Sequence, residues 1–559
     1  MALKARDATT SLFVGLGWLV VVAGAALRLW HAGAKSLWYD EVNSIGVASF
    51  SWGGVIGALR GGTKFYPPGF PYLLKLWMLA GTSDAWVKTL PALLGAGVVA
   101  LTWVWARQLF DVRVAFVATF LTACSTYEIY FAQELRMYVL LAFVALASWV
   151  FLMQAVATNR NAWWALWAVS TSLCMYSFYF GAFFIVGEAV WLLLLAAFRP
   201  ELRRPVLLWS TVSFVIFLPW LPSAIKQWHD GGSRAWISSP ASLSTIDRAI
   251  TIFCAYTIGN HVNWQTRILS HVRDLMAVLF FLGLIAGNSA SSAQAQTLPP
   301  VSLRGRFKHS WLGSALEHLG RAMGEEQQQR WLLFLLIAFG VLGPIVCSMV
   351  VQPFYDVRYV LFAAVPFYLL IARGLVRGME YCLALVNWQK RFLRWQAVVL
   401  LAIMAGYAFV NAYPMKELYS DWEFGQADFQ DATAFVLQHY QPNDVVVHDH
   451  QFSWLPMLWY AYRDHGPGPY TNVSFIPAVP DAWLVHAPMK QIWGSDTFLS
   501  SWLPQGNGRL WLVSRTNYTA SHPNTDVSSI VSFHPPEPAW HLVSNTFFEG
   551  VRVRLFAHQ

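Results

Sequence analysis

Long runs of apolar residues, separated by short charged segments, recur through most of this 559-residue sequence. The runs from Ser11 to Leu29 and from Trp331 to Val351 are each long enough to cross a bilayer core of about 30 Å as a helix. Only 12% of the residues are charged, compared with about a quarter in soluble domains. The sequence therefore predicts a mainly α, polytopic membrane protein.

Hydropathy predicts about eleven membrane-spanning helices. We place them at approximately residues 11–29, 86–106, 112–131, 135–155, 162–180, 182–198, 206–222, 274–288, 331–351, 359–376 and 396–413. With a cytoplasmic N-terminus, this odd number places the C-terminus outside the cytoplasmic (inner) membrane. Basic clusters then face the cytoplasm, as the positive-inside rule expects. They lie at Arg107, at Arg160, at Arg199 with Arg203 and Arg204, at Arg373 with Arg377, and at Lys390 with Arg391 and Arg394.

The apolar stretch from Pro68 to Ala80 needs a separate interpretation. It is too short to span comfortably, and Pro67 and Pro68 break its start. If it crossed the membrane, every later loop would change sides and the basic clusters would face outward. We therefore expect a helix that lies at the outer surface or dips partway into the bilayer.

The pattern changes near residue 414, so the sequence predicts two domains. Residues 1–413 form the transmembrane domain, with outer loops at 30–85 and 223–273 and a cytoplasmic loop at 289–330. Residues 414–559 combine one helical stretch with short apolar runs typical of strands, which predicts a small extracytoplasmic α/β domain. The helix is expected at 427–440, and the strands at 445–447, 510–513 and 551–555.

Two adjacent carboxylates, Asp40 and Glu41, lie just after the first predicted span. Charges at membrane depth are rare, and they are usually paired or functional. Neighbours on a helix diverge by about 100°, so one carboxylate can face a reaction centre while the other holds the loop, a metal or a backbone amide. The structural alternative is that Asp40 caps a helix by accepting backbone N–H bonds.

A second polar group, Gln133 to Tyr138, lies at the outer junction of the third and fourth predicted spans. On a helix, Gln133 would pair with Arg136, and Glu134 with Tyr138. A carboxylate, a guanidinium and a phenol would thus gather at the membrane surface that holds Asp40. The structural alternative is an Arg–Glu pair that locks two helix ends.

Two further cations are expected near the same surface. Lys64, which precedes Tyr66, could contact a phosphate or could extend toward the lipid headgroups. Arg358, in the segment Tyr355–Tyr359, is suited to bidentate phosphate binding. Its structural alternative is an ion pair with Asp356.

Other functional classes find little support in the sequence. Much of the net charge of +8 falls in short clusters between spans, so we expect no nucleic-acid partner. The chain contains no Walker loop, no G-x-G-x-x-G that opens a helix and no H-E-x-x-H. The five cysteines show neither a disulfide framework nor a C-x-x-C metal site.

At these residues the sequence resembles the GT-C superfamily of glycosyltransferases that use polyprenyl-phosphate sugars. It is most similar to the bacterial branch related to protein O-mannosyltransferases and the lipid A aminoarabinose transferase. The resemblance covers about residues 12–413 and, more loosely, the C-terminal region. The motifs that carry it are Ser36–Val42, Tyr66–Pro68, Leu90–Pro91, Arg107–Phe110, Gln133–Tyr138, Tyr355–Tyr359, Asp428–Val436 and Pro442–Val447.

The resemblance implies an inverting transfer of a hexose or pentose from a polyprenyl-phosphate donor to an acceptor hydroxyl at the outer face of the membrane. Asp40 would act as the general base. The acceptor would be a glycan, a lipid or a protein, and membrane lipids would surround the helices. The donor phosphate or sugar would be bound by Glu41, Lys64, Tyr66, Glu134, Arg136, Tyr138, Arg358 and Tyr359.

The sequence departs from the family at two places that bear on a cofactor. Family members often carry an acidic residue and a His before Pro-Pro, where this chain has Lys64, Phe65 and Tyr66. They often carry Tyr-x-His-Tyr after span five, where this chain has Tyr176–Tyr179. The loss of two histidines argues against a bound metal, so the resemblance assigns no certain cofactor. Glu41 and Glu134 remain the candidates for holding a divalent cation.

Two other functions compete with an enzyme. A polytopic transporter or lipid flippase for envelope glycan precursors would also place charges within its spans, but the halves of this chain show no convincing repeat. A structural or assembly protein could use its outer domain to recruit partners. The sequence assigns neither the sugar nor the acceptor, because specificity depends on the shape of the pocket.

Overall fold

The computed structural model describes most of the chain, and its residues divide into two compact units. The first unit comprises residues 1–30, 64–70 and 89–415, and the second comprises residues 31–63, 71–88 and 416–559. The described residues are 2–60, 66–230, 245–259, 267–286, 325–350, 356–385, 392–420, 427–441, 444–448, 451–465, 508–519, 522–526, 540–548 and 550–558.

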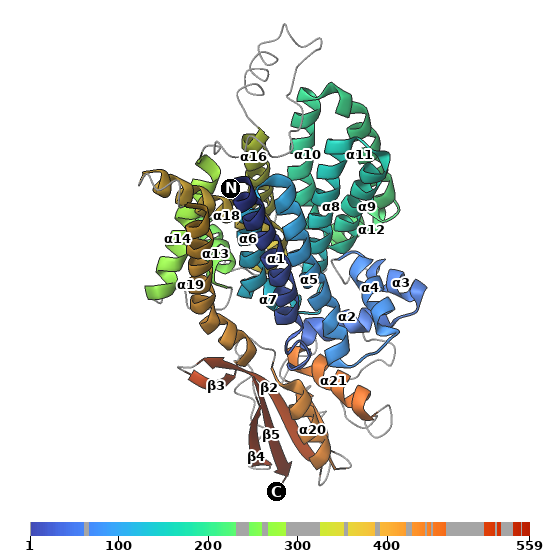
Figure 1. The fold of residues 1–559 in the computed structure, drawn as a ribbon. Coiled ribbons are helices and arrows are strands. Elements are labelled where there is room, and N and C mark those ends of the chain that lie inside the picture. The colour runs from blue at the N-terminus through green and yellow to red at the C-terminus, as the bar shows by residue number, and fades with distance from the viewer. Residues whose placement is uncertain are drawn as a thin grey trace. The chain divides into compact units, whose positions relative to one another are not determined.

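The first unit is built from helices (Figure 1). In chain order these are α1 (Ala2–Leu29), α5 (Asp84–Leu109), α6 (Val112–Cys124), α7 (Thr126–Ala132), α8 (Tyr138–Thr158), α9 (Asn161–Ser177), α10 (Gly181–Phe198), η1 (Pro200–Leu202), α11 (Arg203–Phe217), α12 (Leu221–Asp230), α13 (Thr245–Ile258), α14 (Arg267–Ile285), α16 (Glu325–Ile337), the π-helical turn η4 (Ala338–Leu342), α17 (Gly343–Val350), η5 (Val357–Ala363), α18 (Ala364–Leu385) and α19 (Phe392–Ser420). Residues 84–88 at the start of α5 and residues 416–420 at the end of α19 belong to the second unit.

Every predicted span coincides with at least one of these helices, but the helices differ in length and polarity. Six described helices are long and apolar enough to cross a membrane, or up to eight if each of two bent pairs forms one span. The bent pairs are α6 with α7, at 57°, and the α11 segment with α12, at 63°. The other three predicted spans coincide with α9, α14 and α19. These helices are not among those that are both long and apolar enough to cross a membrane. The chain is a multi-pass membrane protein.

The break between α6 and α7 has a local cause. Ser125 adopts an extended backbone conformation, and its Oγ accepts the Glu128 N–H at 3.2 Å. A serine in this conformation caps the N-terminus of α7, because the side chain replaces a carbonyl that the helix lacks there. The span predicted over residues 112–131 is thus bent at Ser125, a feature that the sequence did not predict.

A buried carboxylate joins three helices of the first unit. Glu188 of α10 accepts hydrogen bonds from Ser148 Oγ of α8 (3.0 Å) and from Trp167 Nε1 (2.9 Å) and Thr171 Oγ1 (3.2 Å) of α9. The buried Glu188 carboxylate therefore has three hydrogen-bond donors from two neighbouring helices. Glycines bring other helices together, because a Cβ at Gly283 of α14 would collide with the Leu370 carbonyl oxygen of α18.

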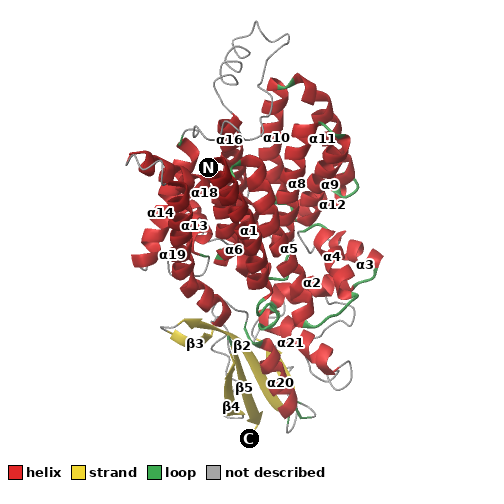
Figure 2. Cartoon of the chain, viewed as in Figure 1, coloured by secondary structure: helices red, strands yellow, loops and turns green. Residues whose placement is uncertain are grey.

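The second unit contains helices and a sheet. Its helices are α2 (Tyr39–Ser49), α3 (Trp52–Arg60), most of α4 (Gly69–Met78), α20 (Phe429–His439) and α21 (Gln451–His465). Its strands are β1 (Val445–His448), β2 (Arg509–Thr519), β3 (His522–Asp526), β4 (Trp540–Phe548) and β5 (Val551–His558). Figure 2 shows that the described strands all lie in the C-terminal part of the chain.

The sheet has the order β1-β2-β5-β4, and β3 pairs with β2. The pairing of β1 with β2 is parallel, and the other pairings are antiparallel. The strands predicted at 445–447, 510–513 and 551–555 correspond to β1, β2 and β5, and the predicted helix at 427–440 corresponds to α20.

The predicted surface helix at 68–80 is α4, a helix of ten residues. At about 1.5 Å per residue it is too short to cross a bilayer core. Lys75 donates to the carbonyl oxygens of Ala48 and Phe50, and the Trp52 and Tyr72 rings are stacked with centroids 5.7 Å apart. These contacts fix α4 against the end of α2 and the start of α3.

Candidate functional site

Asp40 and Glu41 lie in the first turn of α2, and Glu41 is buried inside the second unit. Its side chain is fully buried, and its Oε2 accepts the Trp38 N–H at 3.2 Å. Lys88 Nζ lies 3.5 Å from the same oxygen and is also buried. Glu41 thus caps the helix and forms a buried ion pair, which are both structural roles.

Asp40 precedes Glu41 in the first turn of α2, where consecutive residues are about 100° apart around the helix. It is only partly buried. Its backbone carbonyl accepts a hydrogen bond from Ser44 Oγ at 2.9 Å. Capping of the helix was the predicted structural alternative for Asp40, and here the Glu41 side chain accepts the Trp38 N–H at the start of α2. Asp40 is therefore the more accessible of the two carboxylates.

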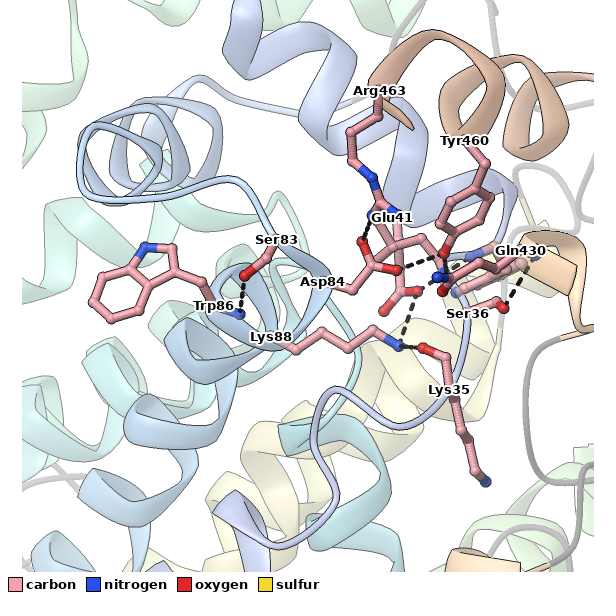
Figure 3. A network of polar contacts seen from close by, with 12 residues as sticks. Lys35, Ser36, Glu41, Ser83, Asp84, Trp86, Lys88, Gln430, Tyr460 and Arg463 are labelled. Carbon is pink, nitrogen blue, oxygen red and sulfur yellow. Dashed lines mark hydrogen bonds and ion pairs between the residues drawn. The ribbon is translucent and has the colours of Figure 1, made fainter. Parts of the chain in front are cut away.

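The sequence did not predict the role of Lys88, because Lys88 lies in another helix than Glu41. Asp84 and Lys88 are four residues apart at the start of α5, where a helix places them on the same face. Lys88 Nζ also donates to the Lys35 carbonyl oxygen at 3.1 Å (Figure 3). Asp84 accepts hydrogen bonds from Tyr460 and Arg463 of α21. Tyr460 and Arg463 lie more than 370 positions from Asp84 in the sequence, so no local pattern predicts these contacts.

The second predicted group has a different local structure from the one expected. Residues 133–137 form a turn between α7 and α8, so the helical pairs of Gln133 with Arg136 and of Glu134 with Tyr138 were wrong. Gln133 Nε2 instead donates to the carbonyl oxygens of Arg28 (3.1 Å) and Trp30 (2.8 Å). The turn is closed by the Arg136 N–H, which donates to the Glu134 carbonyl oxygen at 2.7 Å.

The first unit brings two arginines to a shared aromatic ring. The guanidinium carbons of Arg136 and Arg358 lie 5.8 Å and 5.9 Å from the centre of the Tyr138 ring. Arg136 also lies 5.8 Å from the ring of Tyr66, and Arg358 lies 5.6 Å from the ring of Tyr359. At these distances a guanidinium is attracted to the ring face. Five of the predicted donor-binding residues therefore form one cluster, which we call the arginine–tyrosine cluster.

The predicted structural alternative for Arg358 is also present. Arg358 Nε lies 3.2 Å from Asp356 Oδ2, and about a quarter of the Arg358 side chain (27%) is exposed. The pair can form because Asp356 is the N-cap of η5, with an extended backbone, and is not inside the helix. Asp356 also accepts the Arg358 N–H at 3.1 Å. A partly exposed pair of this kind can open without a large loss of stability.

Aromatic side chains surround Tyr359. The ring centroids of Phe180, Phe178 and Tyr138 lie 4.7, 5.2 and 5.7 Å from that of Tyr359. The cluster thus combines two permanent positive charges with an apolar wall. This combination suits a ligand that carries a phosphate next to apolar groups.

The remaining predicted residues are placed as follows. Lys64 lies outside the described residues. Asp40 and Glu41 belong to the second unit, whereas the arginine–tyrosine cluster and Glu134 belong to the first. Glu134 is buried.

The candidate cation ligands do not form a metal site in the part of the chain that the structure describes. No group of three or more His, Cys, Asp or Glu side chains is placed there to hold a metal ion. The Glu41 carboxylate already faces the Lys88 ammonium. That ammonium supplies the positive charge that a cation would otherwise bring, so Glu41 does not fit a metal ligand.

Comparisons with known proteins agree with this helical architecture. A family model described as dolichyl-phosphate-mannose-protein mannosyltransferase matches residues 66–222. This range includes Tyr66, Arg136 and Tyr138, but not Asp40 or Arg358. No curated protein matches the chain.

Two solved structures of ArnT from Cupriavidus metallidurans resemble the whole chain. The apo form is 13% identical, with a TM-score of 0.50, and the match covers 99% of this chain and 98% of ArnT. The form bound to undecaprenyl phosphate is 13% identical, with a TM-score of 0.51 and coverages of 98% and 97%. The likeness shows a shared fold.

The archaeal oligosaccharyltransferase AglB from Archaeoglobus fulgidus, solved with an inhibitory peptide and a dolichol-phosphate, is also similar. It is 14% identical, with a TM-score of 0.43. The match covers 80% of this chain and 64% of AglB, so this chain spans less than two thirds of that protein.

Proposed function

We propose that this chain, which has the GT-C fold of membrane glycosyltransferases, transfers a sugar from a polyprenyl-phosphate donor to an acceptor hydroxyl. The fold shared with ArnT and the family match over residues 66–222 support a membrane glycosyltransferase with a lipid-linked donor. One ArnT structure holds undecaprenyl phosphate, which supports a polyprenyl phosphate as the leaving group. The observation that carries the proposal is the arginine–tyrosine cluster.

In this proposal, Arg136 and Arg358 bind the donor phosphate. Negative charge grows on the phosphate as the sugar leaves, and fixed guanidinium groups stabilise that charge most strongly in the transition state. The rings of Tyr66, Tyr138 and Tyr359 attract the guanidinium groups to their faces and so help to hold the two positive charges in place. Lys64 and Glu134 are proposed to assist, at the phosphate and at the sugar hydroxyls respectively.

Asp40 is proposed as the general base. Its carboxylate takes the proton of the acceptor hydroxyl while the hydroxyl oxygen bonds to the anomeric carbon. The bond between that carbon and the phosphate oxygen breaks, and its electron pair leaves with the lipid phosphate. A single displacement of this kind inverts the anomeric centre. Glu41 supports the base through the ion pair with Lys88 and the cap of α2.

The orientation follows from the distribution of positive charge in the sequence. We propose that the protein lies in the cytoplasmic membrane with its N-terminus inside, because the basic clusters then face the cytoplasm. Asp40 and the C-terminal residues would lie outside, where transfer takes place. The acceptor is a glycan, a lipid or a protein.

The experiment that tests this function uses the purified full chain in liposomes. Radiolabelled polyprenyl-phosphate hexoses and pentoses are supplied with an envelope extract as the acceptor. A glycosyltransferase releases polyprenyl phosphate and moves the label into the extract. A flippase moves the intact donor across the bilayer without cleavage, and that outcome would contradict the proposal. Mass spectrometry of envelope glycans from a deletion strain would then identify the acceptor.

A further inference from the structure

The segment Lys35–Trp38 leads directly into α2, and each of its residues is held by another part of the second unit (Figure 3). The Lys35 carbonyl oxygen accepts from Lys88 Nζ at 3.1 Å. Ser36 Oγ donates to Asp428 Oδ1 at 3.1 Å. Asp428 is also the N-cap of α20, so the segment is joined to the start of that helix. The Trp38 N–H donates to the Glu41 carboxylate, as described above.

The backbone of Leu37 is bound by one side chain, the phenol of Tyr460. Tyr460 Oη of α21 accepts the Leu37 N–H at 2.6 Å and donates to Asp84 Oδ2 at 2.7 Å. Leu37 is fully buried and Tyr460 is 1% exposed. Burial, and after it the Asp84 carboxylate, raises the pKa of the Tyr460 phenol, so the phenol keeps the proton that it donates.

Tyr460 itself is fixed from two sides. The guanidinium carbon of Arg463 lies 4.8 Å from the centre of the Tyr460 ring, and Arg463 Nη1 binds Asp84 Oδ1. Leu455 and Ala461 on the same helix are buried as well. The phenol therefore has little freedom to follow a movement of Leu37, and the position of Leu37 is set by α21.

We infer that Tyr460 is a positioning residue for Asp40, which means that the C-terminal region aligns the general base of the reaction. This inference rests on the proposed function, because it assumes that Asp40 is the base. Asp40 follows Leu37 by three residues, and α2 begins between them. A general base works only within hydrogen-bond reach of its proton, so a small displacement of Leu37 is expected to lower turnover. A misplacement of about 1 Å can cost roughly 100-fold in rate.

The test replaces one phenol and uses a second phenol as the matched control. Tyr460→Phe removes the hydroxyl and keeps the ring. Tyr440→Phe removes a hydroxyl that donates to the Asp444 carbonyl oxygen at 2.8 Å in the same unit, away from α2. Hydrogen–deuterium exchange of the full chain in detergent is measured over residues 37–49. Tyr460→Phe should accelerate exchange there by about tenfold or more, whereas Tyr440→Phe should leave it at the wild-type rate.

Turnover provides the second measurement. Tyr460→Phe should lower kcat by about tenfold or more, with donor KM and melting temperature equal to those of Tyr440→Phe. In an Asp40→Asn background, Tyr460→Phe should lower the residual rate no further, because it acts through Asp40. Exchange over 37–49 equal in the two phenylalanine variants would overturn the inference. A kcat equal in the two variants would overturn it as well.

The outcomes separate this inference from the proposed function. If Asp40→Asn turns over normally, the proposed base is wrong, whatever Tyr460 does. If Asp40→Asn is inactive and Tyr460→Phe matches Tyr440→Phe in exchange and kcat, only the role of Tyr460 is wrong. If Tyr460→Phe accelerates exchange throughout the second unit and lowers its melting temperature, Tyr460 is a general structural residue and the inference fails.

Discussion

Arg136 and Arg358 place their guanidinium groups at nearly the same distance, 5.8 Å and 5.9 Å, from the ring of Tyr138. The two arginines come from distant parts of the sequence, one from the turn before α8 and the other from η5. Like charges repel, so two guanidinium groups that share one ring are favourable chiefly when anions lie near them. Asp356 is one such anion, at 3.2 Å from Arg358, and we propose that the donor phosphate is another.

The first prediction concerns this pair of arginines. Arg358→Ala removes a charged hydrogen-bond donor worth about 1.5–3 kcal/mol, which corresponds to roughly a 10- to 100-fold loss in kcat/KM for the donor. Arg358→Lys should recover only part of the loss, because an ammonium cannot bind two phosphate oxygens in the planar manner of a guanidinium. Steady-state kinetics with varied donor concentration measure the effect.

The control for Arg358 is Arg107→Ala. Arg107 also lies over an aromatic ring, that of Trp103 at 5.8 Å, but outside the arginine–tyrosine cluster. It should leave the donor kinetics unchanged. Arg358→Ala with the same donor kinetics as Arg107→Ala would remove Arg358 from the phosphate site.

The second prediction separates Glu41 from catalysis. Glu41→Gln leaves the Lys88 ammonium buried without its counter-charge, which typically costs about 3–5 kcal/mol. The melting temperature should therefore fall. The double variant E41Q/K88M removes both charges and should recover much of the stability, with measurable turnover. Differential scanning fluorimetry in detergent follows the unfolding.

Glu201→Gln serves as the control, because Glu201 is exposed on η1. Its melting temperature should equal that of the wild type. If Glu41→Gln melts at the same temperature as Glu201→Gln, the ion pair with Lys88 does not stabilise the protein. If E41Q/K88M folds normally and has lost all turnover, Glu41 takes part in the chemistry.

The third prediction concerns the acid sensitivity of the second unit. Burial lowers the pKa of the His448 imidazole from 6.5 to about 3. Between these values the unfolded chain binds a proton that the folded chain does not, so stability falls as the pH drops through this window. The slope approaches about 1.4 kcal/mol per pH unit. Above pH 6.5 the histidine makes no pH-dependent contribution.

His448→Gln should therefore flatten the loss of stability between about pH 6 and pH 4. His541→Gln, at an exposed position of β4, should keep the wild-type slope. Hydrogen–deuterium exchange of residues 444–465 at several pH values measures the local stability. Equal slopes for the two variants would show that His448 is not the group responsible.

The sequence predicted the fold well where the pattern is local. Each predicted span coincides with a described helix, six to eight of which are long and apolar enough to cross a membrane, and short apolar runs located β1, β2 and β5. Two local features were not predicted: Ser125 caps α7 at the bend between α6 and α7, and residues 133–137 form a turn in place of a helix. Neither effect alters the hydropathy pattern, so hydropathy could not detect it.

The candidate site could be predicted only in part. The family resemblance implied a donor-binding role for residues 136, 138, 358 and 359, and the structure brings these four side chains together. The partners of Glu41 could not be assigned, because Lys88 lies in another helix. The roles of Asp84 and Tyr460 depend on a contact between segments far apart in the sequence, which no local pattern encodes. The expectation that Asp40 meets Arg136 and Arg358 at one membrane surface stays a prediction, since these residues belong to different units.

The central claim is that Asp40 is the general base while Glu41 holds the helix that carries it. The most direct test is the turnover of Asp40→Asn, which keeps the shape of the side chain and removes its basicity. The claim predicts a loss in kcat of about 100-fold or more, with a wild-type melting temperature. Near-normal turnover by the folded Asp40→Asn protein would contradict it.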